Sequence, residues 1–292
     1  MTIAKLEARP ISALQAKVGL PAAAVAPAEE LRLRAMVLTH SRIQRDLSIA
    51  AKVHAEAPDK RGHMRNWFQR RYLDLLGSIY LYNEHRGYTA IDRVLEAVKA
   101  RWPDDAALIR TIQKHRADER KHYLMFRRWF ERRGIMPIAV DRACGHIDRF
   151  VGIMFRSTID DLDPSAIVEN DALFERLCRV ISLTERRGHR QVEILLCHPI
   201  VRRDPTLMKI FRIIEKDEPS HWAPYDNWLR THGGRQPCWW ERAIDSFIHR
   251  ELLLLKLPIL FLAPRLSRRS AWPDEEDLLP ESHQGVALAT GS

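Results

Sequence analysis

Two short segments of the chain place a glutamate three residues before a histidine. They are DERKH, which contains Glu119 and His122, and DEPSH, which contains Glu218 and His221. Residues i and i+3 of a helix project from one face, so each pair can offer a carboxylate and an imidazole to the same ion. The spacing alone is weak evidence, because a chain with 13 histidines would contain roughly one such pair by chance.

The sequence around the two pairs gives them more weight. Glu119 lies on an apolar stripe with Ile112 and Phe126, and Glu218 lies on a stripe with Ile214. A buried, ionised carboxylate is costly unless it is paired or coordinates a metal. Both glutamates are therefore predicted to face a core and to require a cation there.

One further glutamate on an apolar face precedes each pair. Glu84 lies between Tyr80 and Tyr88, 35 residues before Glu119, and Glu185 lies 33 residues before Glu218. Both separations suit a helical hairpin, so two similar halves are predicted to bring their ligands to one level of a bundle. Four carboxylates and two histidines suit iron or manganese better than a closed zinc site.

The predicted metal ligands are Glu84, Glu119, His122, Glu185, Glu218 and His221. This set resembles that of the ferritin-like di-iron carboxylate superfamily, in which two helices each supply a Glu and two others each supply a Glu-x-x-His. The resemblance covers about residues 64–231 and implies a four-helix bundle with two iron ions, or manganese in their place. It also implies that Glu84 and His122 bind one ion, that Glu185 and His221 bind the other, and that Glu119 and Glu218 bridge them.

Pro219 departs from the usual motif. A proline inside a helix removes a backbone hydrogen bond. Two interpretations stay open: a local distortion at the metal site, or a helix break that scatters Glu218 and His221.

Other residues beside the predicted ligands also leave alternatives open. His115 and His189 each lie one turn from a ligand glutamate, and each is either an extra ligand or, as is commoner for a lone inward histidine, a hydrogen-bonded core residue. Tyr80 and Tyr88 are either redox-active or, more commonly, packed in the core.

The elements that must position these residues are predicted to be helices. Apolar residues recur at three- and four-residue steps over about 64–98, over the segment that ends near 133, and over 170–197 and 206–230, although Gly87 weakens the first of these helices. Alternating runs typical of strands are missing from the sequence, which predicts an all-α protein. A further helix within 137–168 would lie between the two halves.

The rest of the chain is predicted to surround this bundle, giving a ferritin-like four-helix bundle with additional N-terminal, inserted and C-terminal helices. The predicted regions are a loosely ordered arm (1–28), an accessory helix (29–63), the bundle (64–231), an apolar and basic helix (232–270) and a polar tail (271–292). The C-terminal run IHRELLLLKLPILFLAPRLSRR predicts either attachment to an anionic membrane surface or a helix packed on the bundle.

Charge and cysteine content restrict the partners and the compartment. A formal net charge of +9 indicates an acidic partner, such as anionic lipid, nucleic acid or an acidic carrier protein, unless the arginine runs are simply solvated helix faces. The four cysteines are scattered without a CxxC pair, which favours a reducing cytoplasmic compartment. Attachment to lipid would place the protein at the inner face of the membrane.

The resemblance implies a class of reaction. The inserted segment between Glu119 and Glu185 favours a hydroxylase or desaturase over a compact storage ferritin or a rubrerythrin. Such an enzyme would use O₂, a hydrophobic and lipid-like organic substrate, and electrons from a separate reductase, because the sequence carries no flavin or nicotinamide fingerprint. The alternatives are a tRNA-modifying di-iron hydroxylase and a ferritin-like iron-binding protein without an organic substrate.

Overall fold

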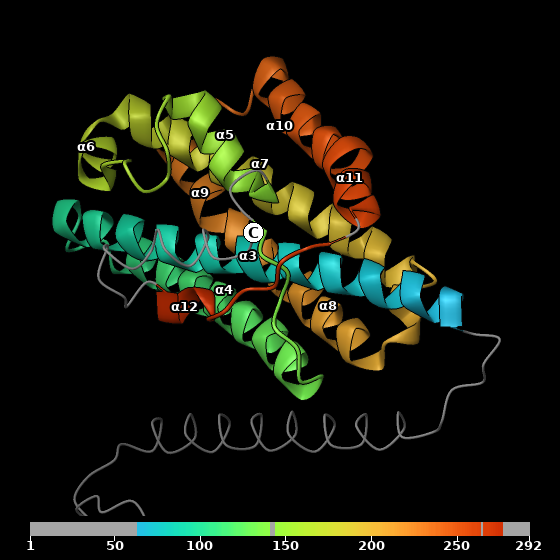
Figure 1. Ribbon diagram of the computed structural model, residues 1–292. Coiled ribbons are helices and arrows are strands. Elements are labelled where there is room, and N and C mark those ends of the chain that lie inside the picture. The colour runs from blue at the N-terminus through green and yellow to red at the C-terminus, as the bar shows by residue number, and fades with distance from the viewer. Residues whose placement is uncertain (1–62, 141–143, 264, 277–292) are drawn as a thin grey trace, which may run out of the picture. The chain divides into compact units, whose positions relative to one another are not determined.

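The computed structural model describes residues 63–140, 144–263 and 265–276, and this part of the chain is helical (Figure 1). Within these ranges the pairing of extended backbone is limited to an isolated antiparallel bridge between Ile138 and Arg268. The prediction of an all-α protein is confirmed. No helix among the described residues is long and apolar enough to cross a membrane.

Two helical hairpins form the core of the molecule. The first pairs α3 (His63–Arg101) with α4 (Ala106–Arg132), and the second pairs α7 (Asp171–Cys197) with α8 (Pro205–Asp217) and α9 (Pro219–Thr231). In Figure 1, α3 crosses the centre of the view with α4 beneath it, and the second hairpin crosses behind them. Four helical rods therefore enclose one core, with α8 and α9 together making the fourth rod.

Local sequence signals set where the core helices begin. The side chain of Asp105 accepts a hydrogen bond from the backbone N–H of Leu108 at the start of α4. Asn170 caps α7 in the same way, and Asp204 caps α8, where Pro205 occupies the first turn. A capping side chain of this kind stabilises a helix by about 1 kcal/mol, and proline is favoured at the first helical position.

Two apolar clusters lie on either side of the predicted ligands. One contains Ile112 of α4 and Tyr225 of α9, and the other contains Phe126 of α4 and Ile214 of α8. Glu119 lies between Ile112 and Phe126 along α4, so the cluster of ligands occupies the middle of the core. Apolar packing thus closes the core on both sides of this level of the bundle.

The fourth rod is interrupted at the position that its proline indicates. The N–H of Glu218 bonds to the carbonyl of Ile214, Pro219 has no N–H to donate, and the next bond runs from the N–H of His221 to the carbonyl of Glu218. A single helix over 206–230 is therefore replaced by α8 and α9. Glu218 and His221 nevertheless remain buried at the junction, 6% and 0% exposed, so the proline distorts the backbone without scattering them.

The segment between the hairpins contains two short helices where one is predicted within 137–168. They are α5 (His146–Phe155) and α6 (Pro164–Glu169). Arg156 ends α5 in the left-handed conformation with φ 55°, and the Asp163 cap with Pro164 starts α6. The chain therefore turns between them, and both lie above α3 in Figure 1.

The C-terminal region also lies above α3 in Figure 1, at the other end of the bundle from α6. It comprises α10 (Trp239–Glu251), a π-helical turn over Leu252–Lys256, α11 (Leu257–Leu262) and, below α3, the short α12 (Pro273–Glu276). α12 is held by the ion pair of Asp274 with Arg127 of α4. The predicted arm (1–28), the predicted accessory helix apart from His63, and residues 277–292 of the predicted tail lie outside the described residues.

Candidate metal centre

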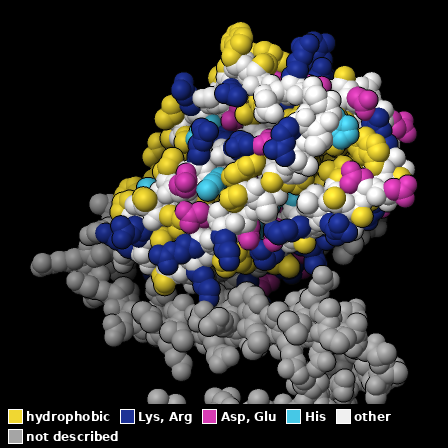
Figure 2. Space-filling view, turned by 180° about the vertical axis from the view of Figure 1, so that it is seen from behind, with side chains coloured by type: hydrophobic (Ala, Val, Ile, Leu, Met, Phe, Trp, Pro, Cys, Tyr) yellow, Lys and Arg dark blue, Asp and Glu magenta, His cyan; other side chains and the backbone are white. Residues whose placement is uncertain are grey.

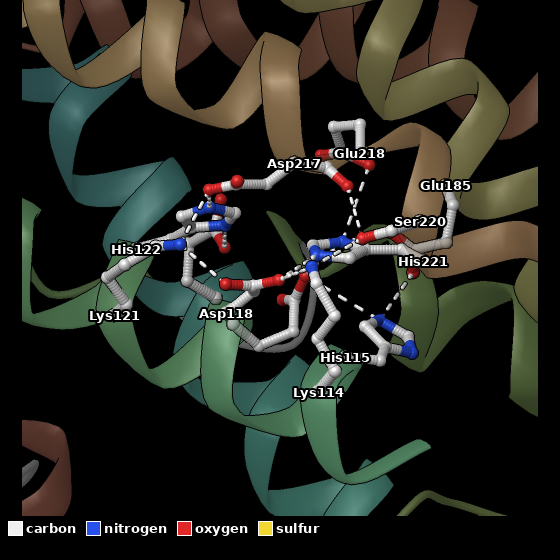
Figure 3. Close-up of polar contacts among 12 residues, drawn as sticks. Lys114, His115, Asp118, Lys121, His122, Glu185, Asp217, Glu218, Ser220 and His221 are labelled. Atoms are coloured by element: carbon white, nitrogen blue, oxygen red, sulfur yellow. Dashed lines mark hydrogen bonds and ion pairs between the residues drawn. The ribbon is translucent and has the colours of Figure 1, made fainter. Parts of the chain in front are cut away.

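The six predicted ligands come from all four rods of the bundle. Glu84 lies on α3, Glu119 and His122 on α4, Glu185 on α7, and Glu218 and His221 at the junction of α8 and α9. Five of them are buried, and the Glu185 side chain is 13% exposed. Figure 3 shows the side chains from α4 and from the α8–α9 junction pointing toward one another across the core.

Two groups of side chains bring their ligand atoms together. The first comprises Glu84, Glu119 and His122, and the second comprises His115, Glu119, Glu185 and His221; within each group these atoms all lie within 4.8 Å of one another. Glu119 belongs to both groups. It is therefore the carboxylate that could contribute a ligand atom to both groups.

The separations within each group suit ligands of a shared ion. His122 Nδ1 lies 3.3 Å from Glu84 Oε2, and His221 Nδ1 lies 3.1 Å from Glu119 Oε1 and 3.6 Å from Glu185 Oε2. Two ligands that are each about 2.1 Å from one ion, at right angles to each other, lie about 3 Å apart. A small inward adjustment of these side chains would complete coordination.

Glu218 is the predicted ligand that stands apart from both groups. Its Oε2 atom is 3.7 Å from His221 Nδ1 and is buried without a hydrogen-bond partner. The structure thus brings five of the six predicted ligands into the two groups and leaves the sixth at the edge of the second. That Glu218 bridges two ions together with Glu119 stays a prediction.

Unpartnered polar atoms support the fit of a metal to these residues. His115 Nε2, His122 Nδ1, both ring nitrogens of His221, and Glu218 Oε2 are buried and make no hydrogen bond. Buried polar atoms normally have partners, because leaving them without one costs free energy. Coordination would satisfy one ring nitrogen of each histidine together with the Glu218 oxygen, and these nitrogen and oxygen donors suit iron or manganese.

The charges of the cluster point to the same need for a cation. Burial, with the negative charge of Glu119, raises the pKa of Glu84 to about 7. Burial, with the charge of Glu185, raises the pKa of Glu218 well above its ordinary value. Burial opposes the charged form of His122, but Asp217 and Glu84 outweigh it and raise its pKa to about 9. Protons thus neutralise part of the buried charge, and a bound cation would replace them.

Two aspartates that the sequence analysis missed lie behind the histidines. Asp217 Oδ2 is 3.1 Å from His122 Nε2, and Asp118 Oδ2 is 3.7 Å from His221 Nε2, so the aspartate of each motif faces the histidine of the other (Figure 3). Lys121 joins the two aspartates, at 2.5 Å from Asp118 and 2.7 Å from Asp217. Carboxylates in this position orient a ligating imidazole and raise its basicity. The signal was the Asp-Glu dipeptide that begins both DERKH and DEPSH.

The two additional histidines, His115 and His189, have different surroundings in the structure. His115 Nε2 lies 3.7 Å from both Glu119 Oε1 and Glu185 Oε1, and its Nδ1 is 3.0 Å from the hydroxyl of Tyr225. If Nδ1 donates its hydrogen to that hydroxyl, the lone pair of Nε2 faces the second group of ligands. His189 instead stacks on Trp222, with ring centroids 5.5 Å apart, and joins neither group.

Two glycines give the carboxylates room. Gly87 lies three residues after the predicted ligand Glu84, and Gly188 lies three residues after the predicted ligand Glu185. A Cβ atom on Gly87 would lie 2.5 Å from Glu119 Oε2, whereas one on Gly188 would lie 3.6 Å from Glu218 Oε1. The repeated Glu-x-x-Gly is a signal in the sequence that was not used for the prediction, in which Gly87 counted only as a weakness of its helix.

A cavity of about 100 Å³ borders the cluster. Its lining includes Glu84, Glu119, Glu185, Glu218, Tyr80 and Leu252. The hydroxyl of Tyr80 is buried without a hydrogen-bond partner, and its ring packs on Phe126 and Phe211 at centroid distances of 5.4 and 5.0 Å. Tyr80 therefore has the ring contacts of a core residue and a hydroxyl at the edge of the cavity.

A buried His146 of α5 also borders this cavity, beside Arg187 and Asp245. Burial and the charge of Arg187 lower its pKa to about 3, although Asp245 acts in the opposite direction. The unfolded chain binds a proton at this histidine below about pH 6.5, whereas the folded chain does so only near pH 3. The stability that the neutral histidine contributes is therefore present above pH 6.5 and is lost as the pH falls from 6.5 toward 3.

We expect His146→Gln to flatten the pH dependence of stability between pH 6.5 and 4. The free energy of unfolding of the unaltered protein should fall more steeply than that of the variant, by up to about 1.4 kcal/mol per pH unit. Urea unfolding at a series of pH values measures this difference. His232→Gln, at an exposed histidine, is the control, and equal slopes for all three proteins would contradict the assignment.

The described residues thus form an all-helical protein with a buried cluster of glutamates and histidines that could hold metal ions. The cluster includes three histidines, of which two face aspartates that lie across the bundle. In comparisons with known proteins, no family model, no curated protein and no solved structure matches the chain.

Proposed function

We propose that the chain is a ferritin-like di-iron oxidoreductase that uses O₂ to hydroxylate or desaturate a hydrophobic substrate, with manganese as the alternative metal. One observation carries this proposal: two groups of buried ligand atoms, contributed by all four rods of the bundle, share Glu119. The order of the ligands, with a single Glu on the first helix of each hairpin and a Glu-x-x-His on the second rod, resembles that of the ferritin-like di-iron proteins.

The surrounding residues would hold and tune the metals. Two iron ions supply the activation of O₂, for which protein side chains have no equivalent. Asp217 and Asp118 orient His122 and His221 from behind, and Lys121 limits the negative charge that the aspartates add. The apolar clusters on either side lower the local dielectric constant, which strengthens the electrostatic contacts within the site.

One of the proposed ligands, Glu84, would release a proton near neutral pH when a metal binds. The pKa of Glu84 is raised to about 7 by burial and by Glu119, and Glu84 lines the cavity beside the cluster. This pKa belongs to the metal-free site, because a bound cation would displace the proton from a ligand carboxylate. Electrons would come from a separate reductase, and the net charge of +9 suits an acidic partner.

The size of the cavity favours a second candidate function, which needs no organic substrate. A volume of about 100 Å³ holds about three water molecules, at roughly 30 Å³ each. It admits O₂ or peroxide without rearrangement, whereas a lipid-like substrate requires the side chains at its edge to move. A ferritin-like protein that oxidises iron without an organic substrate therefore remains the alternative function.

Metal analysis of purified protein supplied with Fe(II) under anaerobic conditions tests the proposal. We expect about two iron ions per chain and, after exposure to air, the optical bands of an oxygen-bridged iron pair. Protein that binds no iron under these conditions would exclude the proposed function. With iron bound, consumption of external reductant that depends on an added hydrophobic substrate supports the oxygenase, and repeated oxidation of added Fe(II) alone supports the alternative.

A further inference from the structure

The segment Trp239–Leu262, which comprises α10, the π-helical turn and α11, has an outward face built from large apolar side chains. They include Trp239, Phe247, Leu253, Leu254, Ile259 and Leu262, and Trp239, Leu254 and Leu262 are 80%, 75% and 76% exposed. Seen from behind, apolar side chains lie at the top and along the upper left edge of the molecule, where this segment runs (Figure 2). We call this surface the C-terminal face.

The charged residues of the segment differ between its two sides: arginines lie on the outward side, and the acidic residues face the rest of the protein. Arg242 and Arg250 are exposed on the C-terminal face. Glu241 is buried against Arg179, Asp245 pairs with Arg187, and Glu251 pairs with Arg149. Every exposed side chain that the structure describes between Trp239 and Leu262 is therefore either apolar or an arginine.

The neighbouring end of α3 extends the same surface. Phe68 stacks on Phe261 of α11 with ring centroids 5.7 Å apart, and Trp67 packs edge-on against the same ring at 6.3 Å. Trp67 and Phe68 are themselves 52% and 43% exposed. The apolar surface thus spans two elements from distant parts of the sequence, and at 1.5 Å per residue its helical segment is about 36 Å long.

The composition of this face selects among its possible occupants. A second copy of the chain, docked by two-fold symmetry, would bring arginines toward arginines with no exposed acid on the face to balance them. Nucleic acid would leave the leucines without partners, because phosphates contact cations and bases stack on aromatic rings. An anionic bilayer satisfies both components, since leucines enter the acyl boundary while tryptophan and arginine meet the head groups.

We propose that the C-terminal face binds the surface of an anionic lipid bilayer. The face is also connected to the candidate metal centre, because Leu252, the first residue of the π-helical turn, lines the cavity at the ligand glutamates. π-Helical turns inside helices occur frequently at functional sites. The idea that a lipid-soluble substrate enters through this turn rests on the proposed function. Binding of the C-terminal face to a bilayer does not depend on that function, so an experiment can contradict either one without the other.

Flotation of the full chain with lipid vesicles tests the proposal. The chain should float with vesicles of phosphatidylglycerol and phosphatidylcholine, and it should bind less to phosphatidylcholine alone or at high salt. Leu254→Glu should weaken binding to the anionic vesicles about tenfold or more. Joint replacement of Arg242 and Arg250 by glutamate should weaken it by at least about fivefold per arginine and should remove most of its salt dependence.

Matched substitutions on α4 control for charge and exposure. Leu124→Glu alters a 40% exposed leucine, and Arg110→Glu reverses an exposed arginine, on the side of the bundle away from α10 and α11 (Figure 1). Both controls should bind vesicles like the unaltered chain. Circular dichroism and metal content should be unchanged in every variant, because all of these positions are exposed.

Each of four results would overturn the proposal. The chain could fail to float with anionic vesicles, which would leave the face to another occupant. Sedimentation could show a dimer that Leu254→Glu dissociates, which would assign the face to a second copy. Vesicle binding could be strong but equally weakened by the α4 controls, or better competed by tRNA than by phosphatidylglycerol, which would place the binding surface elsewhere.

Discussion

Glu119→Gln is expected to reduce the iron bound by the chain from about two ions to at most one. Glu119 is the only carboxylate shared by the two groups of ligand atoms among the described residues, so its loss weakens both metal positions together. Loss of a residue that merely supports a ligand costs 10- to 100-fold in metal affinity, and loss of this shared ligand should cost at least about 100-fold. Titration with Fe(II) or Mn(II), followed by metal analysis, measures the effect.

The same helix provides a matched control for this experiment. Glu131→Gln makes the same chemical change on α4, at an exposed side chain paired with Arg127. It should leave both the number of bound ions and their affinity unchanged. With Mn(II), paramagnetic resonance should detect coupled pairs of ions in the unaltered protein and isolated ions in Glu119→Gln. Retention of coupled pairs in the variant would show that Glu119 does not bridge.

Gly87→Ala is expected to impair metal binding although the residue is not a ligand. The added Cβ would lie 2.5 Å from Glu119 Oε2, a distance at which one of the two atoms must move. The substitution should also favour the helix by about 1 kcal/mol, since glycine is a poor helix former. We therefore expect a protein that folds at least nearly as well as the original and that binds metal more weakly.

Gly188 provides the comparison within the same chain. It occupies the equivalent position in the second hairpin, but its added Cβ would lie 3.6 Å from Glu218 Oε1, which is an ordinary van der Waals contact. Gly188→Ala should gain helix stability and retain metal binding. Thermal unfolding combined with metal titration separates the two effects, and equal metal affinity in Gly87→Ala and Gly188→Ala would refute the role assigned to Gly87.

The core helices are the part of the fold that the sequence predicts best. Apolar periodicity and capping residues such as Asp105 and Asn170 act over a few neighbouring residues, so a sequence pattern contains them in full. The inserted segment is predicted less well, because the left-handed turn at Arg156 has no glycine to mark it. At Pro219 the sequence indicates that a distortion occurs but not its extent, since packing around the junction holds Glu218 and His221 in place.

For the candidate site, the sequence by itself determined that Glu119 and His122 share a face of one helix, because the i to i+3 spacing is a property of a single helix. Only the tertiary structure decided that Glu119 joins two groups of ligands while Glu218 stands at their edge, and that His115 takes part while His189 does not. These outcomes depend on the rotation and offset of each helix relative to the others. Side-chain packing between helices sets that rotation and offset, and no spacing within a single helix contains them.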